Sequence, residues 1–577
     1  MAKQLLLGNQ AAAMGARDGG IAVISSYPGT PSTEITETAA AFPEVYTEWA
    51  ANEKVAAEAA LGSAVTGKRA MCCMKHVGLN VAADLLFTAA YTGVNAGLVL
   101  AVADDPGMHS SQNEQDTRMI AQAAHVPVLE PADSQECYDY FKYAPQLSET
   151  LDMPVIVRLT TRISHARGFV ALGDQVGNFE KDYEKQPAKY IMMPGYARGR
   201  KVDLLKRIEA AKKLSDSTEL NRIEAGDGKV GVICSGVCYQ YVKEALPHAS
   251  ILKLGMVYPL PEQKIREFAA SVEKLYVVEE LEPYIQRQVE SLGIECIGDQ
   301  VFGKAGELSA NLVKQVVEGV DAPTLPDVKD LPPRPPALCA GCPHRGVFYV
   351  LKKMGLTVFG DIGCYTLGAS APLSAMDTCV CMGASVSMAH GAEKAKGCDF
   401  ARKSLAIIGD STFFHSGMTG LATASYNKSN ITVLIVDNST TGMTGHQDNP
   451  ATGKTLKGEY TEPLSLESVC RALGAQHIRV VDSLNIVGLQ AEIQASLNED
   501  GVSVVIARRP CVMIVKGQKN SLQINAEKCI GCGACLKTGC PALQRKGNKV
   551  TIDQTLCNAC GLCAGLCPKQ CMEGASK

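Results

Sequence analysis

LAIIGDSTFFHSGMTGLATASYNKSNITVLIVDN, residues 405–438, contains two apolar runs that each end in polar residues. Leu405 to Ile408 predicts a buried strand ending in Gly409-Asp410-Ser411, and Ile431 to Val436 predicts another ending in Asp437-Asn438. Met418 to Ser425, between them, predicts a helix. A right-handed crossover would bring Asp410 and Asn438 together at the carboxyl ends of neighbouring parallel strands. The stretch therefore predicts a doubly wound α/β domain.

Asp410 and Asn438 could together hold a divalent cation. A carboxylate and an amide oxygen are ligands that Mg²⁺ accepts, and waters and phosphate oxygens would complete its octahedron. Gly409 and Gly442 would let the backbone approach a diphosphate closely. Taken alone, however, a Gly-Asp pair followed by an Asp-Asn pair is a weak signal, and a solvated strand end is the default interpretation.

The composition indicates a globular protein of several domains. A chain of 577 residues is too long for one hydrophobic core and should form about three to five domains. Hydrophobic residues make up 46%, charged residues 20%, and the net charge is -4, which argues against disorder. Basic residues are scattered, so we expect no nucleic-acid partner.

No membrane association is expected either. Met1 to Gly20 lacks the apolar core of a signal peptide, which predicts a cytoplasmic protein. The most apolar stretch, Leu85 to Ala103, is interrupted by Thr92, Gly93 and Asn95. It predicts a helix followed by a buried strand instead of a membrane span.

Apolar periodicity divides the chain into three α/β domains, a connector and a small C-terminal module. The first domain, residues 1–180, has predicted strands at 97–103 and 154–159, and a charged helical connector follows at 181–228. The second domain, 229–320, has predicted strands at 229–234, 251–254 and 275–279. Prolines between Pro323 and Pro336 predict an extended linker. The third domain covers 334–515, with a further strand at 502–507, and the module covers 518–577.

The C-terminal module is rich in cysteine: 8 of the 23 cysteines lie between Cys529 and Cys567. In a cytoplasmic protein such spacing indicates metal ligands and not disulfides. Two CxxCxxC runs, each followed by Cys-Pro, are typical of ferredoxins with two 4Fe-4S clusters, where the cysteine before proline serves the other cluster. A zinc site would use four ligands, whereas this repeat offers eight. One cluster would be held by Cys529, Cys532, Cys535 and Cys567, and the other by Cys540, Cys557, Cys560 and Cys563.

Several further motifs carry a resemblance to a known family. They are YPGTPSTEI (27–35), SSQNEQDTR (110–118), CAGCPHRG (339–346), GDIGCYTLG (360–368), GDSTFFHSG (409–417) and DNSTTGMTGHQ (437–447). On these motifs and the cysteine module, the whole chain resembles the thiamine diphosphate-dependent 2-oxoacid:ferredoxin oxidoreductases, and within them the alpha subunit of the indolepyruvate type. Collectively the motifs are specific, whereas most of them singly are not.

The resemblance implies a role for each domain. Residues 1–180 would bind the aminopyrimidine of thiamine diphosphate, 334–515 its diphosphate, and the cofactor would bridge the two. Residues 229–320 would resemble the transketolase C-terminal domain, and 518–577 a bacterial two-cluster ferredoxin. The diphosphate site would include Gly409, Ser411 and Gly442, and Mg²⁺ would be held by Asp410, Asn438 and the backbone oxygen of Thr440.

Three catalytic residues are implied by the same resemblance. Glu53 would protonate or hydrogen-bond the pyrimidine ring nitrogen, which suits a carboxyl group in an apolar cleft, although Glu58 is a competitor. Thr30 would bind the substrate carboxylate, or it belongs to a plain turn. His344, with Arg345, would face phosphate or carboxylate, as would Lys75 and His76; for each a structural role is an equal alternative.

A third 4Fe-4S cluster, close to the thiamine, is also implied. Its ligands would be Cys339, Cys342, Cys364 and Cys511, although Cys379 or Cys381 could replace one of them. The other cysteines lack ligand spacing and are interpreted as structural. These are Cys72, Cys73, Cys137, Cys234, Cys238, Cys296, Cys398, Cys470 and Cys571.

The activity implied by the resemblance is oxidative decarboxylation of aryl 2-oxoacids, with coenzyme A as acyl acceptor and ferredoxin as electron acceptor. A smaller beta subunit would complete the enzyme. Two alternatives remain open at this point. The substrate could be another 2-oxoacid, such as pyruvate or a branched-chain acid, or the chain could be a non-catalytic electron-transfer subunit.

Overall fold

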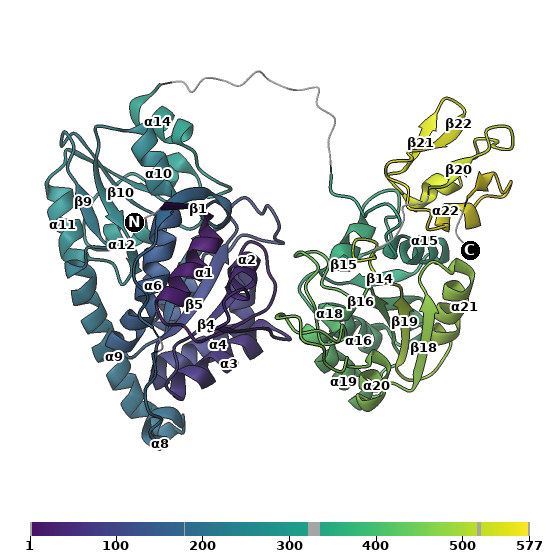
Figure 1. The fold of residues 1–577 in the computed structure, drawn as a ribbon, viewed down its shortest axis with the longest axis horizontal. Coiled ribbons are helices and arrows are strands. Elements are labelled where there is room, and N and C mark those ends of the chain that lie inside the picture. Colours follow the sequence, from purple (N-terminus) through teal and green to yellow (C-terminus); the bar gives the residue numbers. More distant parts are fainter. Residues whose placement is uncertain (1–2, 178, 321–334, 516–520, 575–577) are drawn as a thin grey trace. The chain divides into compact units, whose positions relative to one another are not determined.

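The computed structural model describes residues 3–177, 179–320, 335–515 and 521–574. The chain forms two compact units, Met1–Lys329 and Asp330–Lys577 (Figure 1). Most of the predicted proline-rich linker, Pro323 to Pro336, lies outside the described residues.

Unit 1 contains a seven-stranded sheet. All neighbouring strands are parallel except for one antiparallel edge pair, β12 and β6. The predicted strands at 97–103 and 154–159 are confirmed as β5 and β7. In spatial order the strands are β12 (Met256–Tyr258), β6 (Val128–Leu129), β7 (Val155–Thr160), β5 (Leu98–Asp104), β4 (Ala70–Lys75), β2 (Val23–Ser26) and β3 (Tyr46–Trp49).

Helices pack in pairs against this sheet. Helix α1 (Gly8–Asp18) contacts α6 (Ser134–Leu151), and α3 (Glu53–Val65) contacts α4 (His76–Thr92). Because α4 runs into the buried strand β5, the prediction for Leu85 to Ala103 is confirmed. In the part of the chain that the structure describes, no helix combines the length and apolarity needed to cross a membrane. Unit 1 also has α2 (Thr33–Ala39), α5 (Thr117–Ala124), α7 (Thr161–His165) and an antiparallel ribbon of β1 (Lys3–Leu7) and β8 (Arg167–Ala171).

A second sheet of unit 1 has the order β13-β10-β11-β9. Its strands β10 (Val230–Ser235), β11 (Ser250–Leu254) and β13 (Lys274–Val278) confirm the three strands predicted for residues 229–279. One hydrophobic core extends from Ala11 to Val313, and β12 joins the first sheet, so the two sheets share a packed interior. The remaining elements are β9 (Arg222–Glu224), α10 (Gly236–Ala245), α11 (Glu262–Ala270), α12 (Tyr284–Ser291), α13 (Asp299–Phe302) and α14 (Ala310–Glu318).

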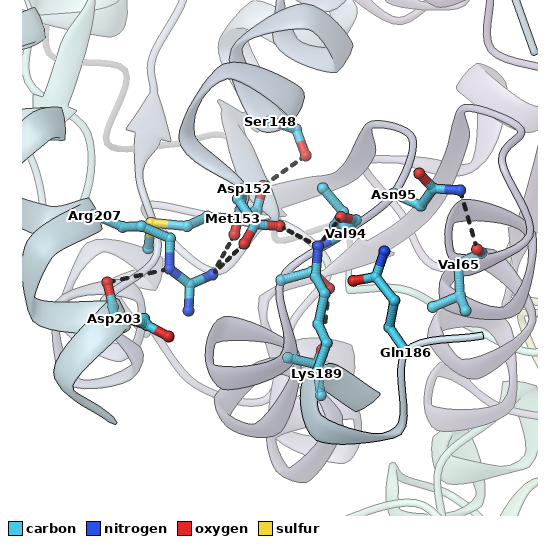
Figure 2. A network of polar contacts seen from close by, with 12 residues as sticks. Val65, Val94, Asn95, Ser148, Asp152, Met153, Gln186, Lys189, Asp203 and Arg207 are labelled. Carbon is cyan, nitrogen blue, oxygen red and sulfur yellow. Dashed lines mark hydrogen bonds and ion pairs between the residues drawn. The ribbon is translucent and has the colours of Figure 1, made fainter. Parts of the chain in front are cut away.

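The segment between the sheets is helical, as predicted. It comprises α8 (Pro187–Tyr190) and the long α9 (Pro194–Ser217). Asp152, in the left-handed region after α6, anchors it: its carboxylate accepts hydrogen bonds from Val94 N (2.9 Å) and Lys189 Nζ (2.8 Å), and its carbonyl accepts one from Arg207 (Figure 2). Arg200 adds an ion pair of 3.4 Å. One aspartate, through its carboxylate and its carbonyl, therefore holds three basic side chains of the connector.

Unit 2 contains a six-stranded, all-parallel sheet. Its order is β15 (Thr378–Cys379), β14 (Thr357–Gly360), β16 (Ser404–Gly409), β17 (Thr432–Asp437), β19 (Ser503–Arg508) and β18 (His477–Asp482). The predicted strands at 405–408, 431–436 and 502–507 are confirmed as β16, β17 and β19.

Alternation along these strands builds a core on each face of the sheet. Leu405, Leu434 and Val505 face one core, which includes α15 (His344–Met354) and α21 (Ile486–Leu497). The next residues along each strand face the other core, with α16 (Ala384–Lys396), α19 (Met418–Tyr426) and α20 (Leu466–Ala472). Helices on both faces make this a doubly wound α/β fold, as predicted.

The cysteine-rich module completes unit 2. Two antiparallel strand pairs, β20 (Gln523–Ile524) with β23 (Met572–Glu573) and β21 (Leu543–Lys546) with β22 (Lys549–Ile552), surround a small core that includes several cysteines. Two short helical turns, η3 (Cys535–Thr538) and α22 (Leu562–Gly565), carry parts of the two cysteine runs. So little apolar core favours stabilisation by bound metal.

Candidate functional site

The ends of β16 and β17 bring Asp410, Asn438 and the Thr440 carbonyl together. One side-chain amide atom of Asn438 lies 3.1 Å from Asp410 Oδ1 and 2.8 Å from the Thr440 carbonyl oxygen. With nitrogen at this position, Asn438 donates a hydrogen bond to both oxygens; with the amide turned the other way, its oxygen would join them as a third ligand for a cation. In an octahedron with Mg–O bonds of about 2.0–2.1 Å, adjacent oxygens are about 2.9 Å apart. The donor set therefore fits Mg²⁺.

Asp410 is buried in a short irregular helical stretch. It begins α18 (Asp410–Thr412), which continues through a π-helical turn, η2 (Phe413–Gly417), into α19. Such π turns are frequent at functional sites. Burial, together with the nearby charge of Asp437, raises the pKa of Asp410 to about 7, and Asn449 Nδ2 donates to its other oxygen at 3.1 Å. A bound cation would favour the ionised carboxylate.

The residues predicted to bind the diphosphate lie around Asp410 and Asn438. Ser411 Oγ accepts from Thr441 Oγ1 at 2.9 Å. A Cβ atom at Gly409 would lie 2.7 Å from the Tyr365 ring, so an aromatic neighbour enforces glycine there. At Gly442 it would lie 3.4 Å from Cys364 Sγ and 3.5 Å from Asn438 Nδ2. The backbone of Gly442 therefore lies between Asn438 and Cys364, a candidate cluster ligand, and is close to both side chains.

The four cysteines predicted for the third cluster are neighbours. Cys511 N donates to the Asn438 carbonyl at 2.9 Å, and Cys342 N donates to the Cys339 carbonyl at 3.2 Å. Burial, with the nearby Cys511 and Cys339 thiols, raises the pKa of Cys364 to about 11. Burial also raises the pKa of Cys342 to about 12, with further contributions from Cys339 and Cys364. The set thus lies next to Asn438, whereas Cys379 is directed to the Asp361 carbonyl at 3.5 Å.

In the C-terminal module each predicted set of four cysteines lines one cavity. One cavity is bordered by Cys529, Cys532, Cys535 and Cys567. Another is bordered by Cys540, Cys557, Cys560 and Cys563. Each cavity thus combines one CxxCxxC run with the Cys-Pro cysteine of the other, and this crossed arrangement fits two cubane clusters. Within the described residues, no three His, Cys, Asp or Glu side chains converge closely enough for a single metal ion.

Cys571, which the sequence left as structural, also lines the first cavity. Its Sγ lies 3.3 Å from Cys567 Sγ. Burial and the neighbouring Cys567 thiol raise the pKa of Cys571 to about 12. The four-residue spacing after Cys567 matches no ligand motif that we considered, so only the fold reveals this fifth thiol.

Glu53 is the first residue of α3, and its side chain is buried. Asn52 caps the helix by accepting from Val55 N at 2.9 Å. The Glu53 carboxyl group lies against Gly78 at the start of α4, where a Cβ atom would come within 2.7 Å of Oε1. Glu58 instead pairs with Lys54, and both side chains are about half exposed. The structure therefore separates the two glutamates that the sequence left as competitors.

Thr30 lies where two predicted motifs meet. Ser110 Oγ donates to the Thr30 carbonyl at 3.4 Å, and Lys75 Nζ donates to Ser111 Oγ at 2.7 Å. The Lys75 side chain also packs 3.3 Å from the position of a Cβ atom on Gly29. Burial lowers the pKa of Lys75, while Asp105 and Glu53 raise it. Ser110 therefore links the Lys75 ammonium group to Thr30, and the charge of Lys75 interacts with Glu53.

His344 and His76, both predicted either to face phosphate or carboxylate or to be structural, are buried. His344 is buried, and its ring packs edge to face on Tyr365, with centroids 5.9 Å apart. Burial lowers its pKa to about 4, which keeps the imidazole neutral. His76 Nε2 contacts the Asn113 carbonyl at 3.1 Å, and burial lowers its pKa. The contacts of His344 are those of packing, and its catalytic role remains a prediction.

Comparison with known proteins assigns the chain to a family. Residues 14–210 match the pyruvate flavodoxin/ferredoxin oxidoreductase thiamine diphosphate-binding domain, and residues 361–507 match the C-terminal TPP-binding domain of thiamine pyrophosphate enzymes. Indolepyruvate oxidoreductase subunit IorA from Archaeoglobus fulgidus is 40% identical, with 99% of this chain and 98% of the relative covered. IorA from Pyrococcus horikoshii is 42% identical, with 98% and 96% covered. A 2-oxoglutarate synthase subunit KorA from Methanothermobacter marburgensis is 26% identical over 47% of this chain and 86% of its own length. The chain therefore belongs to the indolepyruvate oxidoreductase subunit IorA family of thiamine diphosphate-dependent 2-oxoacid oxidoreductases.

Proposed function

We propose that this chain oxidatively decarboxylates aryl 2-oxoacids, with indolepyruvate as the main substrate, and passes the electrons to ferredoxin. Each turnover would convert the oxoacid anion and coenzyme A into acyl-CoA and carbon dioxide and release one proton and two electrons, and clusters would accept the electrons singly. The aryl preference is supported by the names of relatives that are about 40% identical over the whole chain. The observation that carries the proposal is the convergence of Asp410, the Asn438 side-chain amide and the Thr440 carbonyl beside four neighbouring cysteines.

The diphosphate end of the cofactor would be held in unit 2. When bound, thiamine diphosphate supplies the carbanion-stabilising chemistry that decarboxylation of a 2-oxoacid requires. Asp410, Asn438 and the Thr440 carbonyl would hold Mg²⁺, which neutralises the diphosphate. Ser411 and Gly442 would line the diphosphate, because both border this donor set.

The pyrimidine end and the substrate would be served by unit 1. Glu53, buried against Gly78, would hold a proton at the pyrimidine ring nitrogen. Thr30 would bind the substrate carboxylate, and the Lys75 ammonium group close to it would favour that negative charge. The burial of Glu53 and the position of Lys75 support these roles.

The cysteines would hold 4Fe-4S clusters, two in the C-terminal module and one formed by Cys339, Cys342, Cys364 and Cys511. The last set lies beside Asn438 and could take electrons directly from the thiamine site. A smaller beta subunit would complete the enzyme. This partner is supported by the names of the relatives, which are subunits of an oxidoreductase.

Anaerobic co-purification with the smaller subunit allows a direct test. Turnover is compared on indolepyruvate, phenylpyruvate and pyruvate, with ferredoxin or a viologen dye as acceptor. We expect the aryl substrates to be faster, with activity dependent on coenzyme A, thiamine diphosphate and Mg²⁺. Faster turnover of pyruvate would remove the aryl assignment in favour of another 2-oxoacid. Iron and sulfide analysis then counts the clusters: three per chain would support the set at Cys339, whereas two would confine them to the module.

A further inference from the structure

Arg345 is a buried cation between the parallel-sheet body of unit 2 and the C-terminal module. It is the second residue of α15, which lies next to the module (Figure 1), and is 2% exposed. Its Nε donates to the Cys339 carbonyl (2.8 Å), its Nη1 to the Thr538 carbonyl (3.1 Å) and its Nη2 to the Leu338 carbonyl. The guanidinium group therefore joins the CAGC loop, residues 339–342, to the turn that precedes Cys540.

The charge of Arg345 has no carboxylate to balance it. All three acceptors are neutral carbonyls, and no carboxylate of the described residues lies within 4.0 Å of the guanidinium. A buried cation is unfavourable unless an anion compensates it. Burial lowers the pKa of Arg345, and four thiols raise it: Cys540, Cys342, Cys339 and Cys560. Two of these belong to the CAGC loop and two to the module, so cysteines lie on both sides of Arg345.

A second contact places the CAGC loop against one cysteine cavity of the module. Asn558 Nδ2 donates to the Ala340 carbonyl at 3.2 Å. Ala340 and Gly341 line the cavity of Cys540, Cys557, Cys560 and Cys563, which we call the near cavity. The cavity of Cys529 is lined by the module alone. Gly341 has a φ of 73°, and a Cβ atom there would overlap Asn558, so this close approach depends on glycine.

We propose that Arg345 is a positioning residue for electron transfer, whose charge raises the reduction potential of the clusters on both sides and whose hydrogen bonds fix the module on the CAGC loop. The inference rests on the proposed function, which supplies the clusters and the electrons. Cys339, Cys342, Cys364 and Cys511 would hold one cluster and the four cysteines of the near cavity another, and the step that Arg345 would serve is a one-electron transfer between them, with no bond made or broken. A fixed cation stabilises the reduced state because that state carries one more negative charge.

Two variants of the full complex test this proposal. Arg345→Met removes the charge and the hydrogen bonds at similar volume, and Arg345→Lys keeps the charge but loses the planar fork. Arg545→Met is the matched control, since Arg545 is an exposed guanidinium that donates to the Gly531 carbonyl at 3.3 Å beside the other cysteine run. Each protein is analysed anaerobically for iron and sulfide and titrated with dithionite while the reduced clusters are followed by electron paramagnetic resonance.

At a fixed solution potential, we expect Arg345→Met to lower the ratio of reduced to oxidised cluster in the near cavity at least tenfold. For a one-electron couple this corresponds to a fall of about 59 mV in the reduction potential of that cluster. Arg345→Lys should stay closer to the wild type, and Arg545→Met should match it, because water screens an exposed charge. Unchanged potentials in Arg345→Met, or equal shifts in the Met and Lys variants, would overturn the proposal. If Arg345→Met loses iron, Arg345→Lys decides: retained clusters support the proposal, and lost clusters overturn it. Wild-type complex without iron would refute the cluster assignment itself, a failure distinct from that of Arg345.

Discussion

Gly78 offers a way to move Glu53 without removing it. A Cβ atom at residue 78 would lie 2.6 Å from Glu53 Cγ, 2.7 Å from Oε1 and 2.9 Å from Cδ. Carbon atoms pack at about 3.5–4.0 Å, so Gly78→Ala should push the carboxyl group back by about 1 Å. A displacement of that size at a reacting group can reduce turnover by about 100-fold. We therefore expect Gly78→Ala to lose about 10- to 100-fold in kcat/KM for the 2-oxoacid.

The same substitution should leave the fold intact. Alanine is favoured over glycine inside a helix by up to about 1 kcal/mol, and Gly78 lies in α4. The clashing atoms belong to a side chain that can rotate away, so the free energy of unfolding should change by no more than about 1 kcal/mol. Activity and stability are thus expected to respond differently.

Gly62→Ala is the matched control. Gly62 lies in α3, the helix that begins with Glu53, and a Cβ atom there meets no atom within 4 Å. Its alanine variant should keep full activity and gain up to about 1 kcal/mol. The assays are steady-state kinetics with a viologen dye, thiamine diphosphate affinity and chemical denaturation of each variant. Wild-type kcat/KM in Gly78→Ala would refute the assignment of Glu53, as would equal losses in both variants.

Three further predictions follow from the contacts of single residues. Burial raises the pKa of Glu280 to about 7, above its unfolded value of about 4.3, so the folded state binds more protons and stability falls as the pH rises through this window. Glu280→Gln keeps an oxygen that accepts the Leu308 amide but does not titrate. Its free energy of unfolding, relative to that of the wild type, should therefore rise by about 2 kcal/mol between pH 5 and pH 8. Denaturant titrations that show no such rise would contradict the raised pKa. Asp152→Asn keeps the acceptor for Val94 but loses the charge that binds Lys189 and Arg200, so it should lower the free energy of unfolding by about 1–2 kcal/mol, and by less in high salt. The fifth thiol is tested by iron analysis: Cys571→Ser should keep all of its iron, and the variant with both substitutions should lose one cluster. Cys567→Ser should keep part of its iron, because Cys571 Sγ lies 3.3 Å from Cys567 Sγ and could replace it. Loss of a whole cluster in Cys571→Ser alone would make Cys571 the ligand.

Buried strands and residues grouped by short local motifs could be predicted from the sequence. The strands β5, β7, β16, β17 and β19 were found from apolar runs, because burial on both faces of a parallel sheet requires them. The adjacency of Asp410 and Asn438 followed from the handedness of one crossover, and the structure has them 3.1 Å apart. The crossed cysteine sets followed from the two CxxCxxC runs and from the ferredoxin pattern, in which the cysteine before proline serves the other cluster; each set lines one cavity.

Features that depend on contacts between distant segments were not predictable. Glu53 and Glu58 lie on the same helix, and only the Asn52 cap and the approach of Gly78 decide which of them is buried. Lys75 and Ser111 meet through a loop that carries no periodic signal. The packing of β12 on β6 joins two segments predicted as separate domains, because a three-residue edge strand is too short to detect from its own sequence.

Asn438 shows why the cation site and the nearby cysteines are best considered together. Its side chain faces Asp410 and the Thr440 carbonyl, while its own carbonyl accepts the Cys511 amide at 2.9 Å. The same peptide segment therefore fixes a candidate metal ligand and a candidate cluster ligand. Gly442, where a side chain would touch both Cys364 and Asn438, keeps the space between them thin. A change that shifts the loop after β17 should thus disturb magnesium binding and the reduction of the nearby cluster together, whereas a change in the C-terminal module should alter reduction alone.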